Sequence, residues 1–309
     1  MEQEQPLVSV IIPNYNHARY LEQRLDSVFG QTYLNFEVII LDDCSTDNSM
    51  EVINRYKDNP HLSQIVVNET NSGSVFKQWD KGINLAKGEL IWIAESDDYC
   101  ELNMLEELVK AYTAKLNIVV VFCQYVIFSE DYKIKPKEHK TRYYKGKDYI
   151  CNRLIRYCEI RNASGVIFSK EAYNHISKEY MTYKSAGDLR FWCEILQYGD
   201  CAYVGQNLSY FRQNATSVTG TNGTRGVVSN EDKRVYDYVC SVYQLSIWQR
   251  KMVQIKKSRQ YQTDNYDNET IRQQVLHLWG IQRGDGLSKI DGFIFWLSGS
   301  LERHMGILI

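Results

Sequence analysis

The chain has 309 residues, of which 44% are apolar, so it can bury one large core or two smaller ones, and intrinsic disorder is excluded. Its 36 Lys and Arg residues and 38 Asp and Glu residues give a formal net charge of −2, which provides no overall positive field for nucleic acid or an anionic membrane. Its longest uncharged apolar run, residues 117–129, is shorter than the roughly 20 residues of a membrane-spanning helix, so we expect a soluble protein that binds no nucleic acid.

The first hundred residues alternate between strand-like and helix-like patterns. Residues 8–12 form an apolar run that stops at Pro13, and the apolar residues of 21–29 fall on one helical face. The same analysis predicts strands at 36–41, 63–67 and 89–94, and helices at 46–56 and 75–85. Short connections between such units favour an α/β fold with an open, mostly parallel, twisted sheet that is flanked by helices.

The rest of the chain continues this alternation and then becomes helical. The patterns predict a helix at 102–114, strands at 118–122 and 165–168, a helix at 188–196 and one or two strands within 202–212. Residues 130–150 are rich in Lys and Tyr with little periodicity, which predicts a mobile surface loop. Residues 214–230 predict a boundary or flexible lid, and helices follow at 235–257, 269–283 and 290–309.

Two acidic clusters come directly after predicted strands. Asp42 and Asp43 follow one strand, and Glu95, Asp97 and Asp98 follow another. Because the carboxyl ends of parallel strands line the ligand crevice, we expect both clusters to face the same cleft. A divalent cation would relieve their mutual repulsion, and hard oxygen ligands favour Mg or Mn over Zn. Alternatively, each pair caps the helix that follows it.

The sequence lacks the glycine-rich loops that commonly hold phosphate. No G-x-G-x-x-G follows the first strand, and no G-x-x-x-x-G-K-[ST] occurs, which disfavours Rossmann dehydrogenases and P-loop NTPases. The histidines and cysteines show no zinc-site spacing. Charge on a departing diphosphate would then be neutralised by a cation held on carboxylates.

Several segments resemble family 2 inverting glycosyltransferases. They are V-S-V-I-I-P-N-Y-N at 8–16, F-E-V-I-I-L-D-D-C-S-T-D at 36–47, E-S-D-D at 95–98, A-G-D-L-R-F-W at 186–192 and Y-F-R-Q-N-A-T-S-V-T at 210–219. Glu95 replaces the commoner first aspartate of the D-x-D segment, and Asn214 stands where a histidine is usual. The resemblance implies a GT-A-like fold with a nucleotide-sugar-binding half at 1–125, an acceptor and catalytic half at 126–219, and a flexible loop with a helical C-terminal extension at 220–309.

The resemblance also implies roles for single residues. Tyr15 would stack on the nucleobase and Asp42 would accept a hydrogen bond from it, although Tyr15 could equally be ordinary turn packing. The implied donor-binding residues are Pro13, Tyr15, Asn16, Asp42, Asp43, Lys77, Asp97, Arg212 and Ser217. The implied ligands of Mg or Mn are Glu95, Asp97 and Asp98. Lys81 is an alternative to Lys77, and either lysine could instead belong to a solvated helix face.

Direct displacement at an anomeric carbon requires that the acceptor hydroxyl lose a proton as it attacks. The resemblance makes Asp188 the candidate base, and the alternative is that Asp188 caps the predicted helix that begins there. Trp192, just behind Asp188, is a candidate platform for the acceptor sugar. Arg212 and Ser217 would clamp the diphosphate when residues 214–230 close over it.

Together these features predict a metal-dependent inverting transferase. It would move a hexosyl or N-acetylhexosaminyl group from a nucleotide diphosphate sugar, with a UDP-sugar expected, to a hydroxyl of a glycan or lipid-linked saccharide in surface polysaccharide synthesis. The alternatives are a non-catalytic nucleotide-sugar or glycan binding module and, less favoured because an early triphosphate loop is missing, a nucleotidyltransferase.

The ends of the chain bear on its location. The polar, acidic residues 1–5 do not resemble a secretory signal, which predicts a cytoplasmic protein. Basic residues within 251–259 and the apolar segment 293–297 would allow peripheral contact with the inner face of the membrane through the C-terminal helices. Packing on the core or a homodimer contact is the alternative use of these helices.

Overall fold

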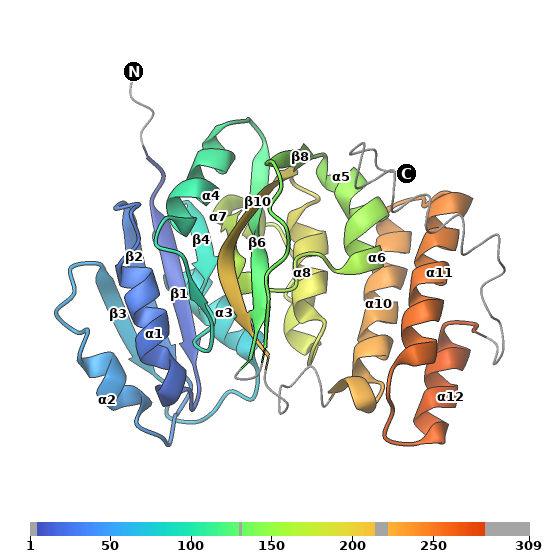
Figure 1. Ribbon diagram of the computed structural model, residues 1–309, viewed down its shortest axis with the longest axis horizontal. Helices are drawn as coiled ribbons and strands as arrows, with labels where there is room; N and C mark the ends of the chain where they lie inside the picture. The colour runs from blue at the N-terminus through green and yellow to red at the C-terminus, as the bar shows by residue number, and fades with distance from the viewer. Residues whose placement is uncertain (1–4, 130–131, 214–221, 282–309) are drawn as a thin grey trace. The chain divides into compact units, whose positions relative to one another are not determined.

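The computed structural model describes residues 5–129, 132–213 and 222–281 (Figure 1). These residues form two compact units. Unit 1 takes its residues from Met1–Lys145, Asn162–Ser177 and Ile195–Asn214, and unit 2 from Gly146–Arg161, Lys178–Glu194 and Ala215–Ile309. The chain therefore passes between the units several times, and neither unit is a continuous stretch of sequence.

A mixed sheet of ten strands forms the centre of unit 1 (Figure 1). The strand order is β3-β2-β1-β4-β9-β6-β10-β5, with β7 paired to β6 and β8 paired to β10. The strands are β1 (Val8–Asn14), β2 (Phe36–Asp42), β3 (Leu62–Val67), β4 (Leu90–Ile93), β5 (Tyr99–Cys100), β6 (Ile118–Phe128), β7 (Lys133–Ile134), β8 (Arg142–Tyr144), β9 (Val166–Ser169) and β10 (Asp200–Arg212).

Strand direction divides the sheet. β1 runs parallel to β2 and β4, β2 runs parallel to β3, and β6 runs parallel to β10. β9 lies between β4 and β6 and is antiparallel to both. β1 and β2 are buried along their whole length, as continuous apolar runs in a two-sided sheet should be. The predicted α/β fold with a central sheet and flanking helices is confirmed, but the parallel order does not extend to β9 or to the short strands.

Helices cover both faces of the first strands (Figure 1). α1 (Ala18–Phe29), α2 (Ser49–Asn54) and α4 (Met104–Thr113) share one core with alternate residues of β1, such as Val10 and Ile12. α3 (Val75–Leu85) packs on the opposite face, where a Cβ at Gly82 would lie 2.3 Å from Ile11 Cγ2. Gly82 therefore permits a close approach of α3 to the sheet. The short helix η2 (Ala163–Gly165) precedes β9, and α7 (Lys170–Tyr173) follows it.

The Lys- and Tyr-rich segment is more regular than the predicted loop. β7 pairs antiparallel with the end of β6, and β8 pairs antiparallel with the first half of β10. These ladders satisfy backbone groups that a free loop would leave to water. Residues 133–134 and 142–144 therefore belong to the sheet, and the expectation of a mobile loop is corrected for these two short strands.

Unit 2 is helical in its described residues. Its elements are α5 (Gly146–Tyr149), the π-helix η1 (Ile150–Leu154), α6 (Ile155–Tyr157), η3 (Glu179–Thr182), α8 (Gly187–Ile195), α10 (Val227–Val242), α11 (Ile247–Thr263) and α12 (Glu269–Leu278). The predicted helix at 235–257 is in fact two helices, because Ser246 begins α11 with a capping box: its hydroxyl accepts from Gln249 N, and Gln249 returns a bond to Ser246 N. The predicted helix at 290–309 lies outside the described residues.

A buried ion pair joins two of these helices. Lys257 of α11 contacts Asp232 of α10, and Tyr261 Oη donates to Asp232 Oδ2 at 2.6 Å. Lys257 therefore belongs to the interior and is not part of a basic surface. Among the described helices, none has the length and apolar character that crossing a membrane requires.

Candidate active site

The first acidic cluster begins where β2 ends. Asp42 lies opposite Asn14 in the parallel ladder, and Asn14 Nδ2 donates to Asp42 Oδ2 at 2.8 Å. Ser45 N donates to Asp42 Oδ1 at 2.8 Å. Asp42 is 1% exposed, so these two bonds fix the orientation of a buried carboxylate at the carboxyl edge of the sheet.

Asp43, the next residue, organises the loop between β3 and α3. Its carboxylate accepts from Asn68 Nδ2 at 2.5 Å, from Ser72 N at 2.9 Å and Oγ at 2.7 Å, and from Gln78 Nε2 at 3.1 Å. Because its hydrogen-bonding capacity is largely used by the protein, the structure gives Asp43 a supporting role. Direct contact of Asp43 with a donor stays a prediction.

The turn after β1 presents an aromatic ring. Tyr15 is 46% exposed, whereas Pro13 is buried in β1 opposite Leu41. Asn16 has a left-handed backbone (φ 55°), and its Oδ1 accepts from the backbone N–H of Thr46 at 2.7 Å. Pro13 and Asn16 therefore shape the turn, and Tyr15 is the member of this predicted set that is open to stacking.

The second acidic cluster lies at the same edge of the sheet. β1 stands between β2 and β4, and Ala94 N continues the β1–β4 ladder by donating to Ile11 O at 2.8 Å. His17 Nδ1 and Ser96 Oγ are 2.8 Å apart, which links the turn after β1 to the turn after β4. The structure therefore brings the two acidic clusters to the edge at which the sequence placed them.

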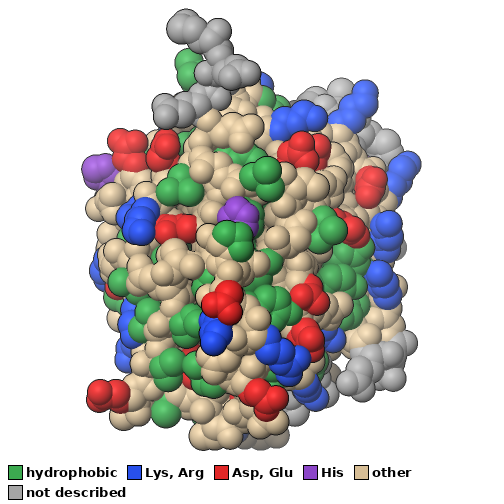
Figure 2. All heavy atoms as spheres, turned by 90° about the vertical axis from the view of Figure 1, so that its left-hand side faces the viewer, with side chains coloured by type: hydrophobic (Ala, Val, Ile, Leu, Met, Phe, Trp, Pro, Cys, Tyr) green, Lys and Arg blue, Asp and Glu red, His purple; other side chains and the backbone are tan. Residues whose placement is uncertain are grey.

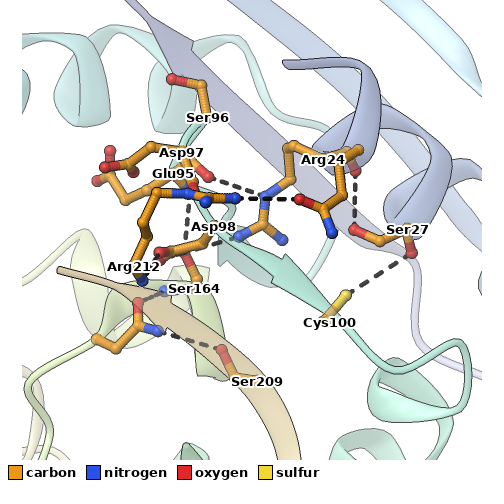
Figure 3. A network of polar contacts seen from close by, with 12 residues as sticks. Arg24, Ser27, Glu95, Ser96, Asp97, Asp98, Cys100, Ser164, Ser209 and Arg212 are labelled. Atoms are coloured by element: carbon orange, nitrogen blue, oxygen red, sulfur yellow. Dashed lines mark hydrogen bonds and ion pairs between the residues drawn. The ribbon is translucent and has the colours of Figure 1, made fainter. Parts of the chain in front are cut away.

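A buried arginine holds the second cluster (Figure 3). Arg24 of α1 is fully buried, and its Nε donates to Glu95 O at 2.8 Å. One guanidinium nitrogen of Arg24 lies 4.0 Å from Asp98 Oδ2. Asp98 Oδ2 accepts from Ser164 Oγ at 2.7 Å, and Asp98 Oδ1 accepts from Arg212 N at 2.8 Å. Asp98 is thus a buried anchor between α1, η2 and the end of β10.

Arg212 supports the same turn from the last residue of β10 (Figure 3). Its Nε donates to Asp97 O at 2.7 Å, and its guanidinium lies 4.2 Å from the centre of the Tyr20 ring and 4.4 Å from that of Phe128. The predicted phosphate clamp is therefore engaged with the acidic turn itself. Its predicted partner Ser217, like Asn214, lies outside the described residues.

Crowding of the carboxylates shows in their acidities. Burial raises the pKa of Glu95 to about 8, and the charge of Asp97 adds to this against the hydrogen bond that Trp79 Nε1 donates to Glu95 at 2.8 Å. Burial likewise raises the pKa of Asp98 to about 7, again with a contribution from Asp97 and against the charge of Arg24. A cation beside Asp97 would relieve this repulsion.

The carboxylates of the second acidic cluster do not form a complete metal site by themselves. Within residues 5–129, 132–213 and 222–281, no three His, Cys, Asp or Glu side chains are grouped so that they could hold a metal ion. The predicted trio of Glu95, Asp97 and Asp98 is therefore not a preformed site, because Asp98 is occupied by protein donors. Asp97 is partly exposed, and Mg is commonly held by one or two carboxylates completed by substrate phosphates.

The two candidate lysines lie on α3. Lys77 is exposed, and its Nζ donates to Ser72 O at 3.3 Å. Lys81 is partly buried and contacts Asn68. Lys77 is therefore free to reach a ligand by releasing one weak bond, whereas Lys81 helps to hold the loop that Asp43 organises.

In unit 2, Asp188 lies in the first turn of α8. Its Oδ1 accepts from Leu189 N at 2.7 Å. Burial, together with the nearby charges of Asp232 and Glu231, raises the pKa of Asp188 to about 7 against the effect of this hydrogen bond. Asp188 is the second residue of α8 and so not its N-cap, and the expectation of a capping role is corrected. The role of general base stays a prediction, to which this pKa is suited.

A residue that the sequence did not single out holds the segment before Asp188. Glu231 of α10 is buried, and its carboxylate accepts from three consecutive backbone N–H groups, those of Lys184 at 2.7 Å, Ser185 at 2.8 Å and Ala186 at 2.9 Å. These bonds fix the chain one residue before α8 begins. No local motif marks Glu231, because its partners lie some 45 residues away in the sequence.

Trp192 is fully buried within α8 and packs edge-on against Phe191, with 4.9 Å between ring centres. A ring in the core cannot stack on an acceptor sugar. The prediction that Trp192 forms an acceptor platform is therefore corrected: its apolar bulk serves packing.

Several solved structures share this fold. TarS from S. aureus in complex with UDP-GlcNAc matches with a TM-score of 0.65 at 18% identity, over 96% of this chain and 80% of that chain. The mannosyltransferase PcManGT from Pyrobaculum calidifontis in complex with GDP-Man and Mn2+ matches with a TM-score of 0.57 at 15% identity, over 97% and 81%. The central sheet with its flanking helices therefore has the GT-A fold of these structures.

Sequence comparison then gives the family. The model of the family described as "Glycosyl transferase family 2" matches residues 9–176, which is more than half of the chain. The protein therefore belongs to glycosyltransferase family 2 and is a glycosyltransferase. Glycosyltransferase GlyG of Streptococcus pneumoniae is 27% identical over 81% of this chain and 87% of its own length. The putative teichuronic acid biosynthesis glycosyltransferase TuaG of Bacillus subtilis is 28% identical over 64% of this chain and 75% of its own length.

Proposed function

We propose that this glycosyltransferase is a metal-dependent inverting enzyme that transfers a hexosyl or N-acetylhexosaminyl group from a UDP-sugar to a hydroxyl of a glycan or lipid-linked saccharide. The observation that carries the proposal is the meeting of two acidic clusters and the exposed Tyr15 at one edge of the sheet. The UDP-GlcNAc bound to TarS and the naming of TuaG for teichuronic acid biosynthesis support a UDP-sugar donor and a role in surface polysaccharide synthesis.

The donor would bind along this edge. Tyr15 offers its ring to the base. Asp42 is buried but accepts only one hydrogen bond on each carboxylate oxygen, so it keeps acceptor capacity for an N–H of the base. Asp97, with Glu95 beside it, would hold Mg or Mn, which when bound neutralises charge on the departing diphosphate. Lys77 would add a positive charge near the same phosphates.

Transfer with inversion needs a base on the side of the sugar opposite the nucleotide. Asp188 would take the proton from the acceptor hydroxyl as the hydroxyl oxygen attacks the anomeric carbon and the bond to the diphosphate breaks. Its raised pKa lets it accept a proton near neutral pH and release it afterwards. Glu231 would act through the backbone by fixing the segment that leads to Asp188.

The C-terminal helices would provide a peripheral contact with the inner face of the membrane, or a contact with a second copy of the chain. Lys251 and Arg259 of α11 are exposed and could meet an anionic surface or a second copy of the chain, whereas Lys257 is buried. Residues 293–297 lie outside the described residues. Flotation with vesicles containing anionic lipid should recover the protein at low salt if the membrane contact exists.

Release of UDP from candidate UDP-sugars, measured with and without Mn and with saccharide acceptors, tests the proposed activity. The expected result is acceptor-stimulated, metal-dependent release. Asp97→Ala should lose the metal-dependent part of donor binding, while Asp58→Ala, an exposed acid on a distant loop, should behave as wild type. Donor binding without release under all conditions would instead indicate a binding module.

A further inference from the structure

The segment of unit 1 that joins β7 to β8 carries a concentrated positive charge. We call residues 132–145 the lysine strip. Four of its lysines, Lys133, Lys135, Lys137 and Lys140, are exposed within eight residues of sequence. A fifth, Lys145, pairs with Asp200 at 2.8 Å. The chain as a whole has a net charge of −2, so this positive charge is a local feature.

The backbone of the strip is fixed to the sheet at several points. Ile134 pairs with Ile127 at one end, and Arg142 pairs with Tyr203 at the other. Between them, His139 N donates to Gly205 O at 2.7 Å. The lysines are therefore presented by an ordered support, which lowers the conformational entropy that binding a ligand would cost.

Gly205 makes room for this support. A Cβ at Gly205 would lie 2.3 Å from the carbonyl oxygen of His139, a separation that cannot be accommodated without displacing the strip. Gln124 Nε2, from the neighbouring strand, donates to Lys137 O at 2.8 Å. The strip thus lies directly on β10 because the residue beneath it has no side chain.

The strip contains one carboxylate, and that group is occupied. Glu138 Oε1 accepts from Asn207 N and from Asn207 Nδ2, each at 3.3 Å. On the face that Figure 2 turns to the viewer, by contrast, acidic and basic side chains are interspersed. Within the strip, four exposed lysines thus outnumber one exposed carboxylate.

One end of the strip lies beside the candidate active site. Lys133 Nζ is 4.6 Å from the centre of the Tyr210 ring, and Tyr210 stacks on Tyr99 with 4.3 Å between ring centres. Tyr99 follows Asp98 in the chain. From β7, which pairs with the outer side of β6, the strip crosses β10 near Gly205 to β8, which pairs with the outer side of β10 at Cys201. Its lysines thus begin beside the acidic turn and continue across the β6–β10 pair.

We propose that the lysine strip binds an anionic acceptor polymer, a glycan or polyol chain that carries carboxylate or phosphate groups. This inference rests on the proposed function and adds the chemical class of the acceptor. Charge complementarity would hold the growing chain along the strip while its end reaches the transfer site. Binding of this kind is weakened by salt, because the charges involved are exposed.

Binding of polygalacturonate, a carboxylated polysaccharide, tests the proposal, with neutral dextran as the comparison. Wild-type protein should bind polygalacturonate but not dextran, with an affinity that falls as salt rises. The triple variant Lys135→Gln/Lys137→Gln/Lys140→Gln should bind about tenfold more weakly, as expected from the loss of three exposed ionic contacts. The matched triple variant Lys57→Gln/Lys87→Gln/Lys110→Gln removes the same charge from other exposed positions and should bind as wild type.

Gly205→Ala tests whether the position of the lysines matters in addition to their charge. It keeps every lysine but displaces their support, so it should also weaken binding of polygalacturonate. Thermal shift with UDP reports the donor site independently: both strip variants should keep the wild-type response. If UDP does not raise the melting temperature of the wild-type protein, the result would instead count against the proposed function. Equal polygalacturonate binding by the strip triple and its matched control, or equal binding of dextran, would overturn the inference.

Discussion

At the scale of residues, the acidic edge separates side chains that hold the site from side chains that are open to a ligand. Asp43 and Asp98 are buried and accept several protein hydrogen bonds, whereas Tyr15 and Asp97 are accessible. Buried and accessible aspartates look the same in the sequence motif. The sequence alone could therefore locate the cluster but could not assign a role to each aspartate.

Glu231 gives a prediction at this scale. Glu231→Ala should lower the free energy of unfolding by about 1–3 kcal/mol, because it leaves backbone N–H groups without their acceptor. Glu231→Gln keeps an acceptor but removes a charge that raises the pKa of Asp188. The acid limb of its kcat–pH profile should therefore move to lower pH. Asp237→Asn, on the exposed face of the same helix, is the control, and an unshifted profile in Glu231→Gln would contradict the contribution of the Glu231 charge to the pKa of Asp188.

The acidity of Asp188 gives a second prediction. Its pKa is raised from 3.8 in the unfolded chain to about 7 in the folded one, so the folded protein retains a proton that the unfolded chain has lost. The stabilisation is complete below about pH 4 and is lost as pH rises through 7. Asp188→Asn should therefore be more stable than wild type at pH 8 and equally stable at pH 4, as measured by urea unfolding. A variant less stable at pH 8 would contradict the raised pKa.

For the secondary-structure elements, the periodicity of apolar residues located the strands and helices of the first hundred residues. Strands that are buried on both faces of the sheet appear in the sequence as continuous apolar runs. It missed the break between α10 and α11, where one capping serine interrupts a continuous helical pattern. It also missed β7 and β8, whose exposed Lys and Tyr residues become strands only through pairing with β6 and β10. Local pattern cannot report a ladder partner that is distant in sequence.

The close packing of α3 on β1 yields a prediction for an element. Gly82→Ala should cost about 1–3 kcal/mol of stability, because the added methyl group would overlap Ile11. The shift should also disturb Trp79, which is on the same helix and bonds Glu95. Thermal unfolding measures the loss, and Gly223→Ala, where a Cβ meets open space, is the control. Equal melting temperatures for both variants would show that α3 is not tightly seated.

At the scale of the whole molecule, the acidic clusters at one sheet edge and the GT-A fold were accessible from sequence, because both depend on short motifs that follow strands. Arg24, Glu231 and Gly205 were not, since each acts on residues far away in the chain. Net charge was equally uninformative about the lysine strip, because a total averages over patches of opposite sign.

In the proposed mechanism, Asp188 removes the acceptor's proton during sugar transfer. The most direct measurement compares UDP release and UDP-sugar affinity in wild type and Asp188→Asn, with acceptor and Mn present. In Asp188→Asn, transfer should fall by roughly 10²–10⁴-fold while donor affinity stays within a few-fold of wild type. Transfer at near the wild-type rate in Asp188→Asn would contradict it.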